Sequence, residues 1–570
     1  MSADLSPLVR VFRAMTGSRA VAVLFVALVA CYAGLGLIVL APEAVYSGDI
    51  GVKYVQARAL WDQRFTSLDI SYPAESLDPA RKFFPMRPPF VMSVGPTTQA
   101  IFSPSSAVIQ AVAVGIAGLR GLIALSVLAG AIVLYATVRL APDGLEVPVL
   151  VAIGLGGPLW FYAVSGSEHA LAVACGTAAY ACAMRAPVSI APVAAGLLIG
   201  AGAAFRDEVL LLLPGLLIVT WTAHRAVRPV LIVVAAALVP LAGAAAVEVW
   251  WFGRPAAAHL RHAVHLVQKA AHLTDAPNPD LPTLTPFTLR QRYETIVQYW
   301  LLGYGNNRVI AWFAAGLAAA LVLRWRWRVS LGLLAWIAAI VVLAWMDLRE
   351  VVTAPKWLAG LHRVSPYLAF AVLPQPAGRA AAWPWRRAML GAAAAYLVVA
   401  AAAVDTTGGK SLGPRLLLPL FPLLTVTAVA SIANYMRAEG FVDRTIGRAG
   451  ALLVLMTLVV HLFGTIPAYR SRNQDDASAV VAVGTAPESI VLADDEFVAQ
   501  LLLPLYFRKT ILLVDTPELG REAARRMTDA QATGFIMVSR RPTAQISLRP
   551  FDLYRIEPAG RLSTQFWRQR

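Results

Sequence analysis

Four short segments carry charged side chains directly beside long apolar runs, and two of them combine an acid with a nitrogen base. SGDIGVK places Asp49 and Lys53 four residues apart, on one face of a helix that Ser47 can cap. SGSEHAL places Glu168 and His169 at the start of a further apolar run. An ionisable pair at the rim of a membrane span is costly and indicates a function, whereas an acid at a helix start also simply complements the helix dipole. The residues alone leave both interpretations open.

The other two segments carry cations that can bind an anion. FRDE holds Arg206, Asp207 and Glu208 in a short turn between apolar runs. The guanidinium can present its planar fork to a phosphate, although three charges at an interface also simply mark a turn. In TTGGKSLGPR, Lys410 and Arg415 belong to a glycine-rich turn at a helix start, where backbone N–H groups and positive charge can cradle an anion. This turn is not a P-loop, because a valine stands where GxxxxGK needs its first glycine.

The elements that position these segments are membrane helices. Of 570 residues, 58% are hydrophobic and 14% charged, whereas soluble globular chains carry about 25% charged residues. Repeated apolar runs of roughly 17 to 25 residues are each long enough to span a bilayer. The net charge of +16 fits short basic loops on the inner side of a membrane, so nucleic acid is not expected as a partner. The three cysteines lie in apolar runs and imply no disulfide framework.

Hydropathy predicts an all-α polytopic membrane protein of about thirteen transmembrane helices, with the N-terminus inside and the C-terminus outside. Nearly all arginine clusters beside the spans then fall on the inner side, and the four charged segments fall on the outer side. The large first outer loop, 42–118, contains Val52, Val55 and Ala59 at a spacing that predicts a helix along the membrane surface. The predicted spans are 20–41, 119–138, 147–163, 169–184, 188–204, 209–223, 229–252, 308–323, 329–345, 365–374, 387–404, 415–433 and 449–466.

The tail has a different pattern and predicts a separate domain. SIVLADD, TILLVD and GFIMVS are typical of short buried strands, and helical segments alternate with them. This alternation predicts a small C-terminal soluble α/β domain with a mainly parallel sheet, over 467–570, after a transmembrane domain over 1–466. No glycine-rich loop follows its first strand, so dinucleotide binding is not expected.

Together these motifs resemble those of the GT-C superfamily of membrane glycosyltransferases, which includes protein O-mannosyltransferases, aminoarabinose transferases and arabinosyltransferases. The resemblance covers roughly 20–466 and rests on Asp49 after the first span, Glu168 between the third and fourth, the FRDE segment and the large first loop. GGKSLGPRLLLPLFP is also similar to the GGWSxGPRYLLPxLP pattern of bacterial members. The DxD form of some members is absent, because Ile50 and Gly51 follow Asp49, so the use of a divalent metal stays open.

The resemblance implies an inverting transferase in the cytoplasmic (inner) membrane whose active site faces the periplasm or exterior. It would take a sugar from a polyprenyl-phosphate donor and pass it to a cell-envelope glycan, lipid or protein. Asp49 would be the general base on the acceptor hydroxyl, positioned with the help of Glu168. The leaving phosphate needs preorganised cations, which the resemblance assigns to Lys53, Arg206, Lys410 and Arg415, with His169, Asp207 and Glu208 in support.

Other functions share part of this pattern. A polymerase or ligase of lipid-linked glycans would use the same donors and would also face outward. A transporter or lipid flippase would instead have internal repeats and ionisable residues near the middle of the bilayer, whereas the charges here cluster at span ends. A third alternative is a scaffold without catalysis, in which the α/β tail binds a partner.

Overall fold

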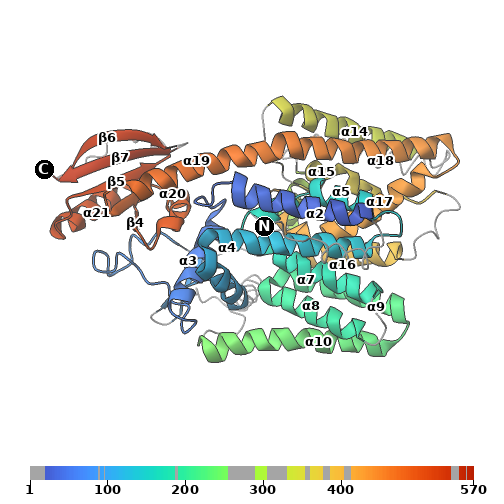
Figure 1. The fold of residues 1–570 in the computed structure, drawn as a ribbon, viewed down its shortest axis with the longest axis horizontal. Helices are drawn as coiled ribbons and strands as arrows, with labels where there is room; N and C mark the ends of the chain where they lie inside the picture. Colours follow the sequence, from blue (N-terminus) through green and yellow to red (C-terminus); the bar gives the residue numbers. More distant parts are fainter. Residues whose placement is uncertain are drawn as a thin grey trace, which may run out of the picture.

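The protein combines a bundle of apolar helices with a β-sheet and its helices at one end (Figure 1). The structure is a computed structural model. It describes residues 19–87, 90–94, 97–185, 190–253, 289–303, 330–353, 358, 360–376, 385–403, 412–540, 548, 551–559 and 562–569.

Long apolar helices make up the bundle, and the chain is a multi-pass membrane protein. Within the described ranges, six helices are long and apolar enough to cross a membrane. A helix suits this environment because every backbone polar group is satisfied within the segment. The six are α2 with the π-helix η1 (Arg19–Val39), α4 (Pro104–Leu140), the 3-10 helix η2 with α9 (Asp207–His224), α10 with η3 (Val227–Trp251), η6 with α17 (Arg415–Met436), and α18 through α19 (Phe441–Thr485).

Shorter helices complete the bundle and include several that the predicted spans cover. Four have apolar stretches of 10 to 17 residues: α5 (Glu146–Leu155), α7 (His169–Arg185), α8 (Ala191–Phe205) and part of α14 (Ser330–Thr353). The others are α6 (Leu159–Val164), α12 (Leu289–Tyr293) with η4 (Glu294–Leu302), α15 (Leu361–Val364), η5 (Pro366–Ala371) and α16 (Arg386–Ala403).

Most of the thirteen predicted spans coincide with described helices, and two differ. The prediction of a span at 365–374 is wrong, because this stretch holds η5, a 3-10 helix of six residues that begins at a proline and is too short to cross a bilayer. The predicted span 147–163 is divided into α5 and α6 by a break between them. The predicted span 308–323 lies outside the described residues.

The domain boundary also differs from the prediction. The helix that begins at Phe441 continues to Thr485, so residue 467 lies inside it. Figure 1 shows α18 and α19 running the length of the bundle and leading directly to the sheet. The second half of α19 packs Ala479, Val480 and Val483 into one core with strands β3 (Ile490–Ala493) and β5 (Gly534–Ser539), so a helix rather than a loop joins the sheet to the bundle.

The sheet of this unit is mixed. Strands β3 (Ile490–Ala493), β4 (Thr510–Leu513) and β5 (Gly534–Ser539) are parallel, as predicted, with α20 (Glu496–Leu501), the short η8 (Leu503–Leu505) and α21 (Pro517–Asp529) in the connections. An antiparallel hairpin of β6 (Phe551–Ala559) and β7 (Leu562–Gln569) extends the sheet from β5, giving the order β4-β3-β5-β7-β6. This hairpin was not predicted from the sequence.

Helix α3 (Gly48–Asp62) packs one face against the α/β unit. Val52 and Val55 are fully buried in one core with Leu492 of β3 and Leu503 of η8. An apolar stripe looks the same in sequence whether it faces lipid or protein, and here Val52 and Val55 face protein. The position of α3 along a membrane surface stays a prediction. The unit and the membrane part share this core.

Helix α3 is held on its other side by α4. The first part of α4 packs Ala107, Ala111 and Val114 against Ala57 and Leu60 of α3. The α4 backbone then kinks where Gly118 takes φ +58°, a conformation that side chains other than glycine rarely adopt. The kink separates the part of α4 that supports α3 from the part within the bundle.

The rest of the first loop binds the α/β unit through buried polar contacts. Asp78 is fully buried, where its carboxylate accepts from the Phe83 N–H at 2.7 Å, the Tyr72 hydroxyl at 3.1 Å and Arg526 of α21 at 2.9 Å. A short hairpin of β1 (Val91–Val94) and β2 (Thr97–Ala100) follows in the same loop.

Gly48 and Gly51 allow α20 and η8 to approach α3 closely, which gives a first prediction. A methyl group on Gly51 would lie 2.9 Å from Leu503 Cδ1 and 3.0 Å from the backbone oxygen of Gln500. We expect Gly51→Ala to lower the thermal unfolding midpoint, because overpacking costs about 1–3 kcal/mol. Gly243→Ala in α10 is the control, since a methyl group there meets nothing within 4 Å. Equal midpoints for the two variants would show that the contact is not tight.

Candidate active site

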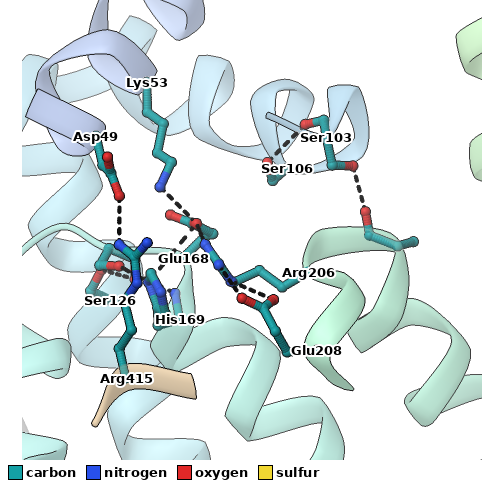
Figure 2. Close-up of polar contacts among 12 residues, drawn as sticks. Asp49, Lys53, Ser103, Ser106, Ser126, Glu168, His169, Arg206, Glu208 and Arg415 are labelled. Carbon is teal, nitrogen blue, oxygen red and sulfur yellow. Dashed lines mark hydrogen bonds and ion pairs between the residues drawn. The ribbon is translucent and has the colours of Figure 1, made fainter. Parts of the chain in front are cut away.

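Four chain segments that are far apart in sequence meet at the N-terminal end of α3 (Figure 2). The first turn of α3 supplies Asp49 and the second supplies Lys53. Glu168 comes from the turn between α6 and α7, Arg206 from the turn between α8 and η2, and Arg415 from the first residue of η6. The structure therefore brings together residues from all four charged segments. Lys410 lies outside the described residues.

The centre of this site is a buried ion pair between Lys53 and Glu168. Lys53 Nζ lies 2.7 Å from Glu168 Oε1, and the two side chains are only 2% and 3% exposed. Arg206 Nη1 contacts the same carboxylate oxygen at 2.5 Å. Lys53 Nζ also lies 4.1 Å from the centre of the Phe102 ring, which adds a cation–π contact. Glu168 therefore holds two cations from different segments at one point.

The protonation state of Glu168 follows from its neighbours. Burial by itself raises the pKa of this carboxyl, because it disfavours the charged form. The positive charges of Lys53 and Arg206 act in the opposite direction and lower the pKa of Glu168 well below its usual value. Glu168 is therefore an anion throughout the physiological pH range.

A second ion pair joins Asp49 to Arg415. Arg415 Nη1 donates to Asp49 Oδ2 at 2.7 Å, and the two side chains are 21% and 20% exposed. Burial raises the pKa of Asp49, but Lys53 and Arg415 together lower it below the usual value. Asp49 is thus ionised, more accessible than Glu168 and bound to one guanidinium. Of these two carboxylates, it is the one that an acceptor can reach.

The two remaining acids of the FRDE segment lie beside Arg206. Arg206 Nε donates to Glu208 Oε2 at 3.0 Å, and its Nη2 contacts the other oxygen of that carboxylate. Asp207 is the first residue of η2. The ion-paired side chains of the site therefore comprise three cations, Lys53, Arg206 and Arg415, and three anions, Asp49, Glu168 and Glu208.

Three buried polar atoms of the site have no hydrogen-bond partner among the described residues. They are the carboxylate oxygen Glu168 Oε2 and the nitrogens His169 Nε2 and Arg415 Nε. His169 and Arg415 line one small cavity together with Arg206, Glu208 and Pro419. A buried polar group without a partner is costly, so these atoms are positioned to contact a bound molecule.

The residues around the site differ in how clearly the sequence indicates their contacts. Phe102 reaches Lys53 only through the fold of the first loop, and no spacing signals it. Ser167, whose hydroxyl lies 2.5 Å from His169 Nδ1, was visible in SGSEHAL as a hydroxyl two residues before a histidine. Ser47 is the N-cap residue of α3, as expected, but its side chain makes no capping hydrogen bond.

A metal site is not evident in the described part of the chain, where no group of three or more His, Cys, Asp or Glu side chains has a metal-binding arrangement. The described acids of the site are instead paired with lysine and arginine.

The buried pair gives a prediction for stability. Glu168→Gln leaves Lys53 and Arg206 without their shared anion, and breaking a buried pair costs about 3–5 kcal/mol. Glu294→Gln is the control, because its partner Arg290 is 87% exposed and such surface pairs contribute about 0–1 kcal/mol. Thermal unfolding of the purified variants measures both. An equally small decrease in the thermal unfolding midpoint of the two variants would show that the Glu168 pair does not support the fold.

The same pair predicts how stability depends on pH. The folded-state pKa of Glu168 is lowered, so its contribution is fully present above the ordinary value of 4.5 and is lost as the pH falls toward the folded-state pKa. We expect the unfolding midpoint of the parent protein to fall below about pH 4.5 and that of Glu168→Gln to fall less steeply. Parallel curves for the two proteins would contradict this assignment.

The chain was compared with known proteins. No protein-family model matches it, and no curated protein matches it. Among solved structures, it is similar to ArnT from Cupriavidus metallidurans in the apo state, with 14% identity, a TM-score of 0.47, and coverage of 95% of this chain and 97% of that chain. The same protein bound to undecaprenyl phosphate gives 14% identity, a TM-score of 0.46 and the same coverage.

Proposed function

We propose that the protein is a membrane glycosyltransferase that moves a sugar from a polyprenyl-phosphate donor to an acceptor hydroxyl. The observation that carries the proposal is the pairing of an accessible carboxylate, Asp49, with cations at the ends of membrane helices. A transferase of this kind needs a base for the acceptor and positive charge for the leaving phosphate. Asp49 and Arg415 supply these two groups in direct contact.

The leaving phosphate binds, in this proposal, where Arg415 and His169 line the cavity. Arg415 Nε has no partner within the described residues, and Nη1 is bound to Asp49. A phosphate that enters the cavity competes with Asp49 for the guanidinium. Arg415 then exchanges one anion for another, and Asp49 is released toward the acceptor. Loss of this cation also moves the pKa of Asp49 upward, which makes it a better base.

The reaction is a displacement at the anomeric carbon of the donor. The acceptor oxygen forms the new glycosidic bond, the bond from the anomeric carbon to the phosphate oxygen breaks, and the acceptor proton passes to Asp49. Attack from the side opposite the phosphate inverts the anomeric configuration. The leaving polyprenyl phosphate gains negative charge as the bond breaks, and Arg415 is positioned to stabilise that charge.

Glu168 has a different role in this proposal. It is buried and shared between Lys53 and Arg206, so it fixes these two cations rather than taking a proton. Their charge then contributes to the field around the phosphate without a direct bond to it. The assignment of Lys53 to the phosphate, made from the sequence, becomes an indirect one.

The proposed setting is the outer face of the cytoplasmic membrane, with the α/β unit on the same side as the site. Contact between α3 and η8 supports this, because it places the unit beside the catalytic residues. A lipid donor in the outer leaflet reaches helix ends directly, and an acceptor in the cell envelope reaches the exposed side of Asp49.

The competing functions differ in what they require of the charges. A transporter would place ionisable groups along its substrate path, near the middle of the membrane. The described ion-paired residues of the site instead lie at turns and helix starts. A polymerase or ligase of lipid-linked glycans uses the same chemistry at this site and differs from the proposal in its acceptor.

Asp49→Asn tests the proposal. The amide keeps the size of the side chain but cannot take a proton, so transfer from a polyprenyl-phosphate sugar should fall by about 10²–10⁴-fold. Donor binding should remain or become tighter, because the phosphate contacts come from other residues and the neutral amide competes less for Arg415.

The matched control is Asp62→Asn on the same helix, which removes a carboxylate that is 44% exposed and paired with Arg58. That variant should transfer sugar as the parent does. Near-normal transfer by Asp49→Asn would contradict the assignment of the base and, with it, the proposed enzyme.

A further inference from the structure

We infer that His169 donates a hydrogen bond from Nε2 to the phosphate of the lipid donor, as a neutral partner to Arg415. The inference rests on the proposed function and adds a substrate-contacting residue to it. His169 is the first residue of α7 and is 7% exposed. Its Nε2 is buried and has no hydrogen-bond partner in the described part of the structure. The ring lines the cavity that Arg206 and Arg415 also line.

The hydrogen bonds of Ser167 determine which ring nitrogen carries the proton. Ser167 Oγ lies 2.5 Å from His169 Nδ1 and 3.4 Å from the backbone N–H of His169. The backbone N–H can only donate, so Ser167 Oγ accepts from it. The hydroxyl hydrogen then has Nδ1 as its acceptor, since no other acceptor for it occurs among the described residues. In the inferred tautomer, Nδ1 carries the lone pair and the proton lies on Nε2, because only this tautomer gives the Ser167 hydroxyl hydrogen an acceptor among the described residues.

The ring is held in this orientation by its surroundings. Ser126 Oγ donates to the backbone oxygen of Ser167 at 3.1 Å and so fixes the turn that carries the serine. The ring of Tyr162 packs beside the imidazole, with the ring centres 5.4 Å apart. Figure 2 shows His169 between Ser126, Glu168 and Arg415, on the side of the site away from Lys53. The donor nitrogen is thus oriented before a ligand arrives.

A neutral donor suits this position better than a further cation. Arg206 and Arg415 already line the cavity, and a third positive charge would repel both before a phosphate arrives. A neutral N–H adds a directed hydrogen bond without that repulsion. The developing charge on the leaving phosphate oxygen strengthens the bond as the reaction proceeds, so the contact favours the transition state over the ground state.

Binding of undecaprenyl phosphate in detergent micelles tests the inference, with undecaprenol as the lipid that lacks the phosphate. His169→Phe keeps the ring volume and removes the donor, so we expect undecaprenyl phosphate to bind about ten- to hundredfold more weakly. Undecaprenol should bind as it does to the parent. His169→Gln places an amide N–H near the position of Nε2 and should restore most of the affinity for the phosphate. A residue with a merely structural role would not distinguish the two lipids.

Two further variants complete the experiment. Thr177→Val is the control on α7, because its hydroxyl bonds only within the helix, to Val173. Should His169→Phe fail to fold, Ser167→Ala carries the test, since loss of the fixed tautomer should weaken phosphate binding without affecting undecaprenol.

The outcomes separate this inference from the proposed function. If His169→Phe binds undecaprenyl phosphate as the parent does while Arg415→Ala binds it weakly, His169 is not a phosphate contact and the proposed function stands. If the parent binds undecaprenyl phosphate no more tightly than undecaprenol, the proposed phosphate site falls and the inference falls with it.

Discussion

The buried ion pair between Lys53 and Glu168 constrains the rest of the structure. It joins α3 to the turn before α7, which lies 115 residues away in sequence. Taking two charges out of water costs several kcal/mol per ion, and their attraction offsets this cost only when the geometry is close and further partners are present. Arg206 and the Phe102 ring are those partners. The pair therefore requires that α3, α4, α7 and α8 be held in fixed relative positions.

The supporting architecture follows from that requirement. Helix α3 is packed between the first part of α4 and the α/β unit, so that both of these faces of α3 contact protein. Close approach at Gly51 and the buried Asp78–Arg526 contact tie the unit to the first loop. The C-terminal unit thus belongs to the scaffold of the site. It is not an appendage on a flexible linker, because α18 and α19 form one helix into it.

Several charged residues that the structure brings together could be selected from the sequence, because their charges interrupt apolar runs. Asp49, Glu168, Arg206 and Arg415 were each identified in this way, and the structure brings them together. Their pairing was not predictable: Lys53 lies four residues from Asp49 on the same helix but bonds to Glu168, which only the packing of α3 beside α7 determines.

The predicted and the observed fold differ where the sequence does not show what surrounds an apolar segment. The stretch 365–374 is apolar enough for a span, but it forms a short 3-10 helix buried inside the protein, and hydropathy does not distinguish protein from lipid surroundings. The same ambiguity applies to α3, whose apolar residues Val52 and Val55 face the α/β unit. The three parallel strands were predicted because each is a short apolar run. The β6–β7 hairpin mixes apolar with polar residues and contains no such run.

The central claim is that an anion enters the site by replacing Asp49 as the partner of Arg415. An experimental structure of the protein with undecaprenyl phosphate bound tests this most directly. We expect that structure to show a phosphate within hydrogen-bond distance of Arg415 and His169. The contact between Arg415 and Asp49 should be broken, and the pair between Lys53 and Glu168 should be unchanged. A phosphate bound elsewhere, with the 2.7 Å contact between Arg415 and Asp49 intact, would contradict it.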